Sequence, residues 1–554
     1  MPTVLLAKPW LLPVLLAALV GAMTLDGGFV MDDRHALLQS PVVQGTVPAW
    51  EAWSRSFWGE PLDKAGDAVS WRPLLPLVWR GLWQLGGGAP WPFRLLSLLL
   101  HVAATAGVVQ VLLAMLERSK RASLVANQRE VAVLAGCLFA VHATHAEVVG
   151  AIVSHADLAA TLLGCLGLAG VVRATSGSGS GSGPGSGSGS GPGSGSGSGS
   201  GPGPGSGPGN SSAILLASLW FLPAVLAKES ALLYAAVGMV WLAATRSTGL
   251  AALAAGVAPT AIWTIAMQAK AFAGRTEGAV DNVLVALGGL ERAVTGLAIV
   301  SRAALMSLLP VGLAPSHGYA VYTSDVGDLW PAAGVGALLL AATVVAGVWA
   351  IWRQRPLFAA GLAMWGGTLL AGSHLLFVGP TELAERLLYP ATIVTCMGMA
   401  ALLWLRPWPL AQRQLVAAVT VLGLLAATWE AQRPWAQPLT LWQRAVEVEP
   451  KSWRHQHNLG DALAKSGQTT EGLWHVLVGV WLRRNLPKPV DFRLVEALEL
   501  LPLAERMARA PQVLDPVDPC GLIGQFAAKA YPTSPANQAA AARILTQQTP
   551  CPPL

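Results

Sequence analysis

Apolar runs long enough to cross a bilayer recur along most of this chain of 554 residues. Of its residues, 53% are hydrophobic and only 12% are charged, about half the charged share of an average soluble domain. A helix satisfies its backbone hydrogen bonds internally, so such runs are expected to fold as helices in lipid. We predict an all-α polytopic membrane protein with eleven spans near residues 8–25, 92–116, 131–143, 152–172, 213–227, 230–245, 249–268, 331–352, 357–378, 387–405 and 413–430.

The distribution of basic residues predicts how these spans are oriented. With a cytoplasmic N-terminus, the main clusters of basic residues between spans lie on the cytoplasmic side, as the positive-inside rule requires. They are Lys8, Arg118, Lys120, Arg121, Arg129, Arg173, Arg246, Arg353, Arg355, Arg406 and Arg413. A span at residues 295–314 would move the last four outside. We therefore predict an interfacial or re-entrant helix there, within an outer loop at 269–330. The C-terminal tail is then extracytoplasmic, which in a bacterium means periplasmic with an inner-membrane bundle.

The sequence also predicts how the N-terminus is anchored and which kinds of partner the protein has. Residues 4–25 lack a small-residue cleavage site and are predicted to be an uncleaved signal anchor. The net charge of +6 is accounted for by the cytoplasmic basic clusters, so we expect a lipid bilayer and no nucleic acid as a partner.

The chain divides into two membrane halves, a linker and a tail. The halves are residues 1–175, with a first outer loop at 26–91, and residues 213–432. Between them, residues 176–212 are almost entirely Gly, Ser and Pro, which predicts a flexible cytoplasmic linker. The spans and this linker leave residues 433–554 as a polar tail.

The start of the tail resembles tetratricopeptide repeats. Trp442, Ala445 and Pro450 fit the second helix of one repeat, and Trp453 and Gly460 fit the first helix of the next. At most one and a half repeats are recognisable, whereas an independent array needs about three. We therefore predict that this small helical domain packs against the outer loops.

The five cysteines form two groups. Cys137, Cys165 and Cys396 lie in apolar runs and are predicted to be packing residues. Cys520 and Cys551 lie in the tail, in the predicted oxidising compartment, where a disulfide and two free thiols both remain open.

Polar residues from distant parts of the chain are predicted to meet on the outer face. They are Asp32 and Asp33, Arg72, His142, His145, Glu147, Lys228, Glu229, Glu385 and Arg386, with Ser154-His155 and Asp157 nearby. Ionisable residues at such depth default to a functional interpretation. Alternatives without a catalytic role remain open. Asp32-Asp33 can be a solvated loop, Lys228 and Glu229 can form a local ion pair, and Arg386 can be an interfacial cation that snorkels to the membrane surface. The two histidines and Glu147 lack a further strong ligand for zinc, so we predict no metal site, although a divalent cation stays open.

This set of side chains suits sugar transfer from a lipid-linked phosphate. A carboxylate removes the proton of an attacking hydroxyl, and cations stabilise the leaving phosphate. We predict Asp32 and Asp33 as the catalytic pair and favour Asp32 as the base with Asp33 as its partner, although the sequence does not rank the two. Arg72, His142, His145, Glu147, Lys228, Glu229, Glu385 and Arg386 are predicted to bind the donor phosphate or substrate.

Several segments also resemble a known family. They are Phe29–Asp33, Phe57–Leu62, Arg72-Pro73, Pro90–His101, Phe139–Glu147, Ala156–Leu158, Ala227–Glu229 and Ala384–Tyr389. In this order, over roughly residues 10–405, they resemble the transmembrane and tetratricopeptide repeat-containing family of O-mannosyltransferase-like, GT-C glycosyltransferases. Met31 and Ala143 depart from the expected aromatic and Pro, and Ser154-His155 replaces a Gly-Arg-like pair.

The resemblance implies a GT-C-like bundle that moves a mannose-like sugar from a dolichyl- or polyprenyl-phosphate donor. It also implies a hydroxyl acceptor, often Ser or Thr of a protein, with the acidic pair at the catalytic centre of an inverting enzyme. Two alternatives are an inactive, membrane-anchored tetratricopeptide interaction protein and a lipid-linked sugar transporter. A transporter is expected to carry ionisable groups at the bilayer midplane and inverted repeats, which the sequence does not suggest.

Overall fold

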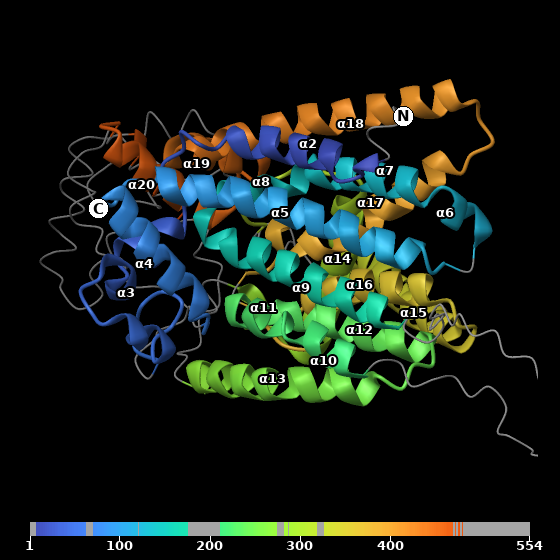
Figure 1. The fold of residues 1–554 in the computed structure, drawn as a ribbon. Coiled ribbons are helices and arrows are strands. Elements are labelled where there is room, and N and C mark those ends of the chain that lie inside the picture. Colours follow the sequence, from blue (N-terminus) through green and yellow to red (C-terminus); the bar gives the residue numbers. More distant parts are fainter. Residues whose placement is uncertain are drawn as a thin grey trace, which may run out of the picture.

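The computed structural model describes residues 7–479 except 63–69, 120, 176–210, 274–281, 286, 318–325, 380, 469–470, 473–474 and 477–478. Nearly all of the predicted linker, the later part of the tail, and both Cys520 and Cys551 therefore lie outside the described residues. Within the described part the fold is all-helical, and the only strand-like pairings there are two isolated bridges, Arg55 with Pro61 and His317 with Leu383 (Figure 1). The predicted all-α class is confirmed.

The first half of the chain contributes thirteen named α-helical and short helical elements. They are α2 (Leu11–Ala22), η1 (Arg34–Leu38), α3 (Pro41–Gln44), η2 (Ala49–Trp53), α4 (Leu74–Gly86), α5 (Trp91–Leu116), α6 (Ala122–Ala126), α7 (Gln128–Ala140), η3 (Ala143–His145), α8 (Ala146–Gly150), η4 (Ile152–Ser154), α9 (His155–Ala174) and α10 (Ser211–Ser218).

The second half continues in the same way. Its elements are α11 (Phe221–Ala227), η5 (Glu229–Ala231), α12 (Leu232–Ala244), α13 (Leu250–Ala273), η6 (Val283–Val285), α14 (Gly289–Leu308), α15 (Val326–Trp352), α16 (Pro356–Ala371), η8 (Glu385–Leu388), α17 (Tyr389–Trp404), α18 (Leu410–Gln432), η9 (Arg433–Ala436), α19 (Pro438–Val448) and α20 (Trp453–Lys465).

Each of the eleven predicted apolar runs forms a helix or a pair of helices. Six are long and apolar enough to cross a membrane: Trp91–Leu116, Ile152–Ala174, Leu250–Lys270, Asp328–Trp352, Glu385–Trp404 and Leu410–Ala436. A seventh, Gln128–Ala140 with Ala143–Gly150, passes only as a pair bent by 50°. Four more are apolar but shorter, namely Leu11–Ala22, Ser211–Ala227, Glu229–Ala244 and Pro356–Ala371. The chain is thus a helical membrane protein, while the count of eleven spans stays a prediction.

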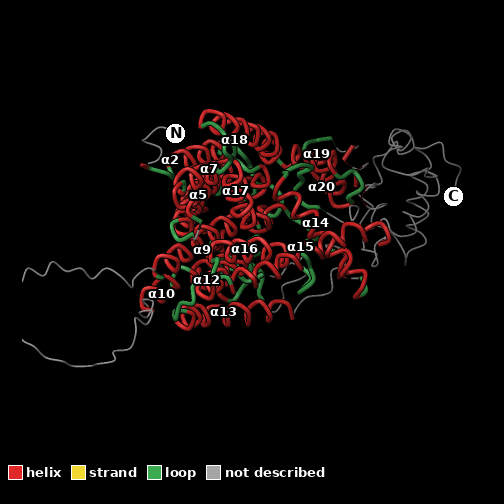
Figure 2. The backbone as a smooth tube through the Cα atoms, turned by 90° about the vertical axis from the view of Figure 1, so that its right-hand side faces the viewer, coloured by secondary structure: helices red, strands yellow, loops and turns green. Residues whose placement is uncertain are grey.

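The core of the bundle and its rim differ in how their apolar side chains are used. Buried residues of α5, α7, α9, α12 and α17, such as Leu138, Tyr234 and Trp404, form one large hydrophobic cluster. In contrast, α13, α15 and α18 leave large apolar side chains such as Trp263 and Val345 exposed. Figure 2 shows α18 and α13 at opposite edges of the bundle, with α9, α16 and α17 between them. An apolar rim of this kind is expected where lipid is the solvent.

The two ends of the bundle carry different structures. The short helices α3 and α4 of the first loop and the tail helices α19 and α20 gather at one end, whereas α6 lies at the other (Figure 1). At the first end, Trp435 of η9 packs among Val30, Ala146 and Ala151, and the Gly28 N–H donates to Ala436 O at 2.9 Å. The tail and the first loop are therefore held together directly.

The helices α19 and α20 pack on each other through Trp442, Ala445, Leu459 and Leu463, and Met31 of the first loop packs against this cluster. Ser452 caps α20, since its hydroxyl accepts the His455 N–H at 3.4 Å. The helix predicted near 295–314 forms as α14, which is not among the helices long and apolar enough to span. Its position relative to a membrane stays a prediction.

Candidate functional site

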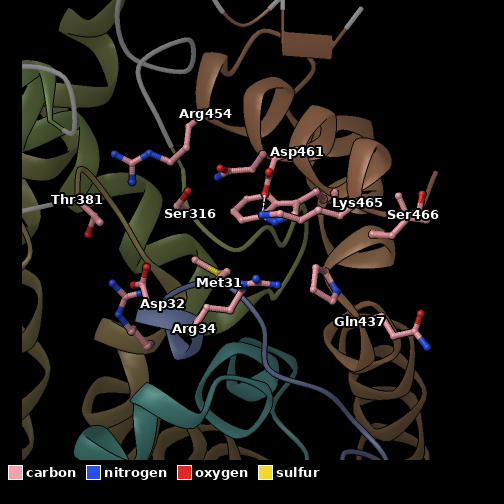
Figure 3. A pocket seen from close by; sticks show the side chains of 16 residues that line it. Met31, Asp32, Arg34, Ser316, Thr381, Gln437, Arg454, Asp461, Lys465 and Ser466 are labelled. Atoms are coloured by element: carbon pink, nitrogen blue, oxygen red, sulfur yellow. Dashed lines mark hydrogen bonds and ion pairs between the residues drawn. The ribbon is translucent and has the colours of Figure 1, made fainter. Parts of the chain in front are cut away.

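A cavity of about 490 Å³ opens at the end of the bundle where the tail meets the first loop. One wall is the first loop with Met31, Asp32 and Arg34, and a second includes Arg386, just before α17. The tail helices α19 and α20 supply the facing wall (Figure 3). The cavity therefore joins parts of the chain that are more than 400 residues apart.

The two adjacent carboxylates are separated by the backbone. Met31, which precedes them, has a φ of 46°, in the left-handed region that costs a non-glycine residue about 1 kcal/mol. Asp32 is half-buried and lines the cavity. Asp33 is fully buried, and its carboxylate accepts the N–H groups of Val30 at 3.2 Å and Val153 at 2.9 Å. Only Asp32 thus reaches the space where a substrate can bind.

Burial also changes the acidity of Asp33. It raises the pKa of this carboxyl to about 7, against the opposing effects of Arg94 and the two N–H donors. This carboxyl is suited to holding the first loop against η4, just before α9, not to accepting a proton from a substrate in solvent.

Arg94, in the first turn of α5, organises the same loop and was missed in the sequence analysis. Its side chain is fully buried, lies 3.9 Å from the Asp33 carboxylate, and donates to Gly27 O at 3.3 Å. It also donates to the carbonyls of Gly28 and Gly150. A cation inside an apolar run was the available signal, because such residues are rare without a specific partner.

We expect Arg94→Met to lower the stability of the folded protein by about 3–5 kcal/mol, because the partners of a buried cation lose it without replacement. Thermal unfolding of the detergent-purified protein measures this change. Arg444→Met is the matched control, since Arg444 is half exposed and, among the described residues, pairs with Glu447 on the surface. Equal melting temperatures for the two variants would contradict the assigned role of Arg94.

Arg386 is the predicted site cation that lines the cavity beside Asp32. Its guanidinium donates to the buried carboxylate of Glu147, and its backbone N–H donates to the same carboxylate at 2.8 Å. Arg386 also lies within electrostatic reach of Asp32. Glu147 therefore fixes the position of Arg386 instead of lining the cavity itself.

Three more predicted residues form ion pairs behind this wall. Arg72 holds Glu229 through two hydrogen bonds of 2.9 and 2.7 Å, and the Lys228 ammonium lies 2.5 Å from Asp157. Lys228 and Glu229 each pair with a partner distant in sequence, so the alternative of a local pair between them is wrong. The pairs tie the segment just before α4 and the first turn of α9 to the junction of α11 and η5, and none of these residues lines the described cavity.

The predicted histidines lie deeper in the bundle. His142 Nδ1 lies 2.8 Å from Thr144 Oγ1, and His145 Nε2 lies 2.9 Å from Thr392 Oγ1. The His145 ring packs against Tyr389, with ring centres 4.4 Å apart. His155 belongs to the Ser154-His155 pair that departs from the family pattern. Its ring accepts the Trp79 indole N–H at 3.1 Å, which is a structural contact. Among the described residues no three His, Cys, Asp or Glu side chains cluster in a way that could hold a metal ion.

His317 connects the predicted residue Glu385 to the tail, a link that the sequence did not suggest. Its ring is buried, with Nδ1 2.7 Å from Glu449 Oε1 and Nε2 3.3 Å from Glu385 Oε1. Burial alone would lower its pKa, but the hydrogen bonds to Glu385 and Glu449 raise the pKa of His317 to about 9. An isolated His in a loop carries no sequence signal for such a bridge.

This raised pKa predicts that docking of the tail depends on pH. Charged His317 stabilises the contact below about pH 6.5, where Glu449 is its charged partner, and this stabilisation is lost as the pH rises through about 9. The shift corresponds to about 3 kcal/mol. We expect limited proteolysis between α18 and α19 to accelerate between pH 8 and 10, and His317→Gln to abolish that dependence. Cleavage that is independent of pH in the wild type would contradict this prediction.

Fold and site together define a polytopic helical membrane protein with a charged cavity at one end of its bundle. The chain is similar to the protein O-mannosyl-transferase Tmtc2 of Drosophila melanogaster, 46% identical over 138 residues, which is 25% of this chain and 14% of that protein. It is also similar to human protein O-mannosyl-transferase TMTC4, 32% identical over 157 residues, which is 28% of this chain and 21% of that protein. These matches confirm the predicted relationship to the transmembrane and tetratricopeptide repeat-containing family.

A longer but weaker match extends over most of the chain. A protein O-mannosyl-transferase of Caenorhabditis elegans is 21% identical over 449 residues, which is 81% of this chain and 59% of that protein. The chain thus covers less than two thirds of the length of each of these three relatives. No family model and no solved structure matches the chain.

Proposed function

We propose that this chain is a glycosyltransferase that moves a mannose-like sugar from a polyprenyl- or dolichyl-phosphate donor to a hydroxyl acceptor. The observation that carries the proposal is the shared cavity of Asp32 and Arg386, one carboxylate and one fixed cation beside each other. The acceptor is proposed to be Ser or Thr of a protein, in line with the names of the relatives.

The reaction follows from the chemistry of these two groups. Asp32 takes the proton from the acceptor hydroxyl as its oxygen attacks the anomeric carbon. Arg386 stabilises the charge that develops on the leaving phosphate, because Glu147 already holds its guanidinium in place. Direct attack on the side opposite the phosphate inverts the anomeric configuration. Asp33, Arg94 and the pairs Arg72–Glu229 and Lys228–Asp157 keep the loop and helices that carry these groups in register.

The surroundings of the cavity suit one lipid-soluble substrate and one water-soluble substrate. The bundle below it exposes apolar side chains to lipid, where a polyprenyl chain can lie, while the cavity itself is lined by polar and charged groups. We propose that the cavity faces the extracytoplasmic side, with the N-terminus inside and eleven spans. The domain division and the tetratricopeptide nature of α19 and α20 belong to the same proposal.

The decisive experiment is sugar transfer by the purified full-length chain. Radiolabelled mannosyl phosphoryl polyprenol is supplied with Ser- and Thr-containing peptides, and label on the peptide is counted. We expect time-dependent transfer to the hydroxyl. Absence of transfer with binding of peptide alone would favour an interaction protein, and movement of intact donor across proteoliposomes would favour a transporter; either result would overturn the proposal.

A further inference from the structure

The wall of the cavity that faces Asp32 is one face of the tail helix α20. Arg454, Asn458, Asp461 and Lys465 follow one another at spacings of four, three and four residues, which places them on one side of a helix. All four line the cavity, and Figure 3 shows Arg454, Asp461 and Lys465 on the helices opposite Asp32 and Arg34. The other side of α20 is used for packing, since Leu459 and Leu463 are buried against α19.

The cavity carries an excess of positive charge. Its lining contains the cations Arg34, Arg386, Arg454 and Lys465 and the anions Asp32 and Asp461, a difference of two charges. Arg386 is held by Glu147, and Lys465 lies 2.5 Å from Asp461 on the exposed surface of α20. Arg34 is exposed, and its side chain has no hydrogen bond or ion pair within the described part of the chain. Such a surface attracts anionic groups and repels cationic ones.

The length of this polar face suits an extended polypeptide. From Arg454 to Lys465 the face is about 16 Å long at the helical rise of 1.5 Å per residue, enough for about five residues of extended chain. The face carries two cations, one amide and one carboxylate, so it can bind the peptide groups of a polypeptide as well as its charged side chains. A sugar phosphate alone would not need a row of this length.

We propose that the polar face of α20, with Arg34 across the cavity, is an acceptor subsite that binds a polypeptide segment with acidic side chains next to the reacting hydroxyl. This inference rests on the proposed function, because it assigns the acceptor of the same cavity. The tail then selects the acceptor, while the first loop and Arg386 act on the donor.

Direct binding of peptides tests the subsite without requiring turnover. Fluorescein-labelled Ser/Thr peptides of equal length, flanked by Glu, Gln or Lys, are titrated against the full-length protein in detergent, and anisotropy is recorded. We expect the Glu-flanked peptide to bind about fivefold more tightly than the Gln-flanked one, and the difference to shrink at high salt. Equal binding of the three peptides would overturn the proposal.

Charge reversal locates the subsite on α20. Lys465→Glu and Arg454→Glu should each remove the preference for Glu flanks and improve binding of the Lys-flanked peptide by about fivefold. Lys451→Glu makes the same change on an exposed residue just before α20 that does not line the cavity, and should leave the preference intact. A preference that survives both α20 variants, or is lost equally in Lys451→Glu, would place the selectivity elsewhere and overturn the assignment.

The outcome also separates this inference from the proposed function. Charge-selective peptide binding without sugar transfer would remove the enzyme proposal and keep a peptide-binding face. Transfer to all three peptides at equal rate and equal KM would keep the enzyme and remove the subsite.

Discussion

Asp32→Asn is expected to lower the rate of sugar transfer by about a hundredfold to ten-thousandfold, the usual contribution of a general base. The amide keeps the shape of the side chain but cannot take the proton of the acceptor. Because Asp32 is half-buried and lines an open cavity, the melting temperature should stay close to that of the wild type. Transfer by the purified variant, together with its thermal unfolding, measures both effects.

Two comparisons sharpen this test. Asp33→Asn should mainly lower the stability of the folded protein. An amide cannot accept both the Val30 and the Val153 N–H groups that the buried carboxylate accepts. Glu447→Gln removes an exposed carboxylate of α19 that is paired with Arg444 on the surface, and should preserve both activity and stability. Wild-type turnover in Asp32→Asn, or a greater loss of activity in a fully stable Asp33→Asn protein, would contradict the division of roles.

Arg386→Met is expected to lower kcat/KM for the lipid-linked donor by about a hundredfold to a thousandfold, the range seen when one transition-state donor is removed. It should also destabilise the fold by about 3–5 kcal/mol, because Glu147 would remain buried without its partner. Kinetics over a range of donor concentration and thermal unfolding give the two quantities separately.

The double variant Arg386→Met, Glu147→Gln distinguishes a chemical role from a structural one. Removing the unpaired charge of Glu147 should recover much of the lost stability, while transfer stays low because no cation faces the phosphate. Activity that returns together with stability would show that Arg386 only supports the fold. Arg386→Lys keeps the charge but loses the planar guanidinium and should fall between wild type and Arg386→Met.

The sequence was informative wherever a property is local. Each apolar run became a helix, because length and hydrophobicity act within a single segment and a lipid-exposed backbone has no other way to satisfy its hydrogen bonds. The order of short motifs likewise predicted the relationship that the comparisons confirm. Cys137, Cys165 and Cys396 are buried without disulfides, as expected for packing residues in apolar runs.

The same local reasoning treated the predicted phosphate- or substrate-binding residues as equivalent, and the structure separates them. Among the predicted phosphate- or substrate-binding residues, only Arg386 lines the cavity, and Glu147 serves as its support. Arg72, Lys228 and Glu229 form ion pairs between helices, and the histidines are enclosed in the bundle. Spacing along the chain does not reveal such differences, since each role depends on which distant residue meets the side chain.

By itself, then, the sequence determined the all-helical membrane class and the position of the helices, and it predicted Asp32-Asp33 as the central acidic pair. Only the tertiary structure decided which of these two carboxylates faces the cavity, through the left-handed backbone at Met31 and the buried contacts of Asp33 with Val153 and Arg94. It also decided that α20 closes the cavity and that His317 links Glu385 to Glu449. Helix formation depends on neighbours in sequence, whereas burial, ion pairing and pKa depend on neighbours in space, which come from hundreds of residues away.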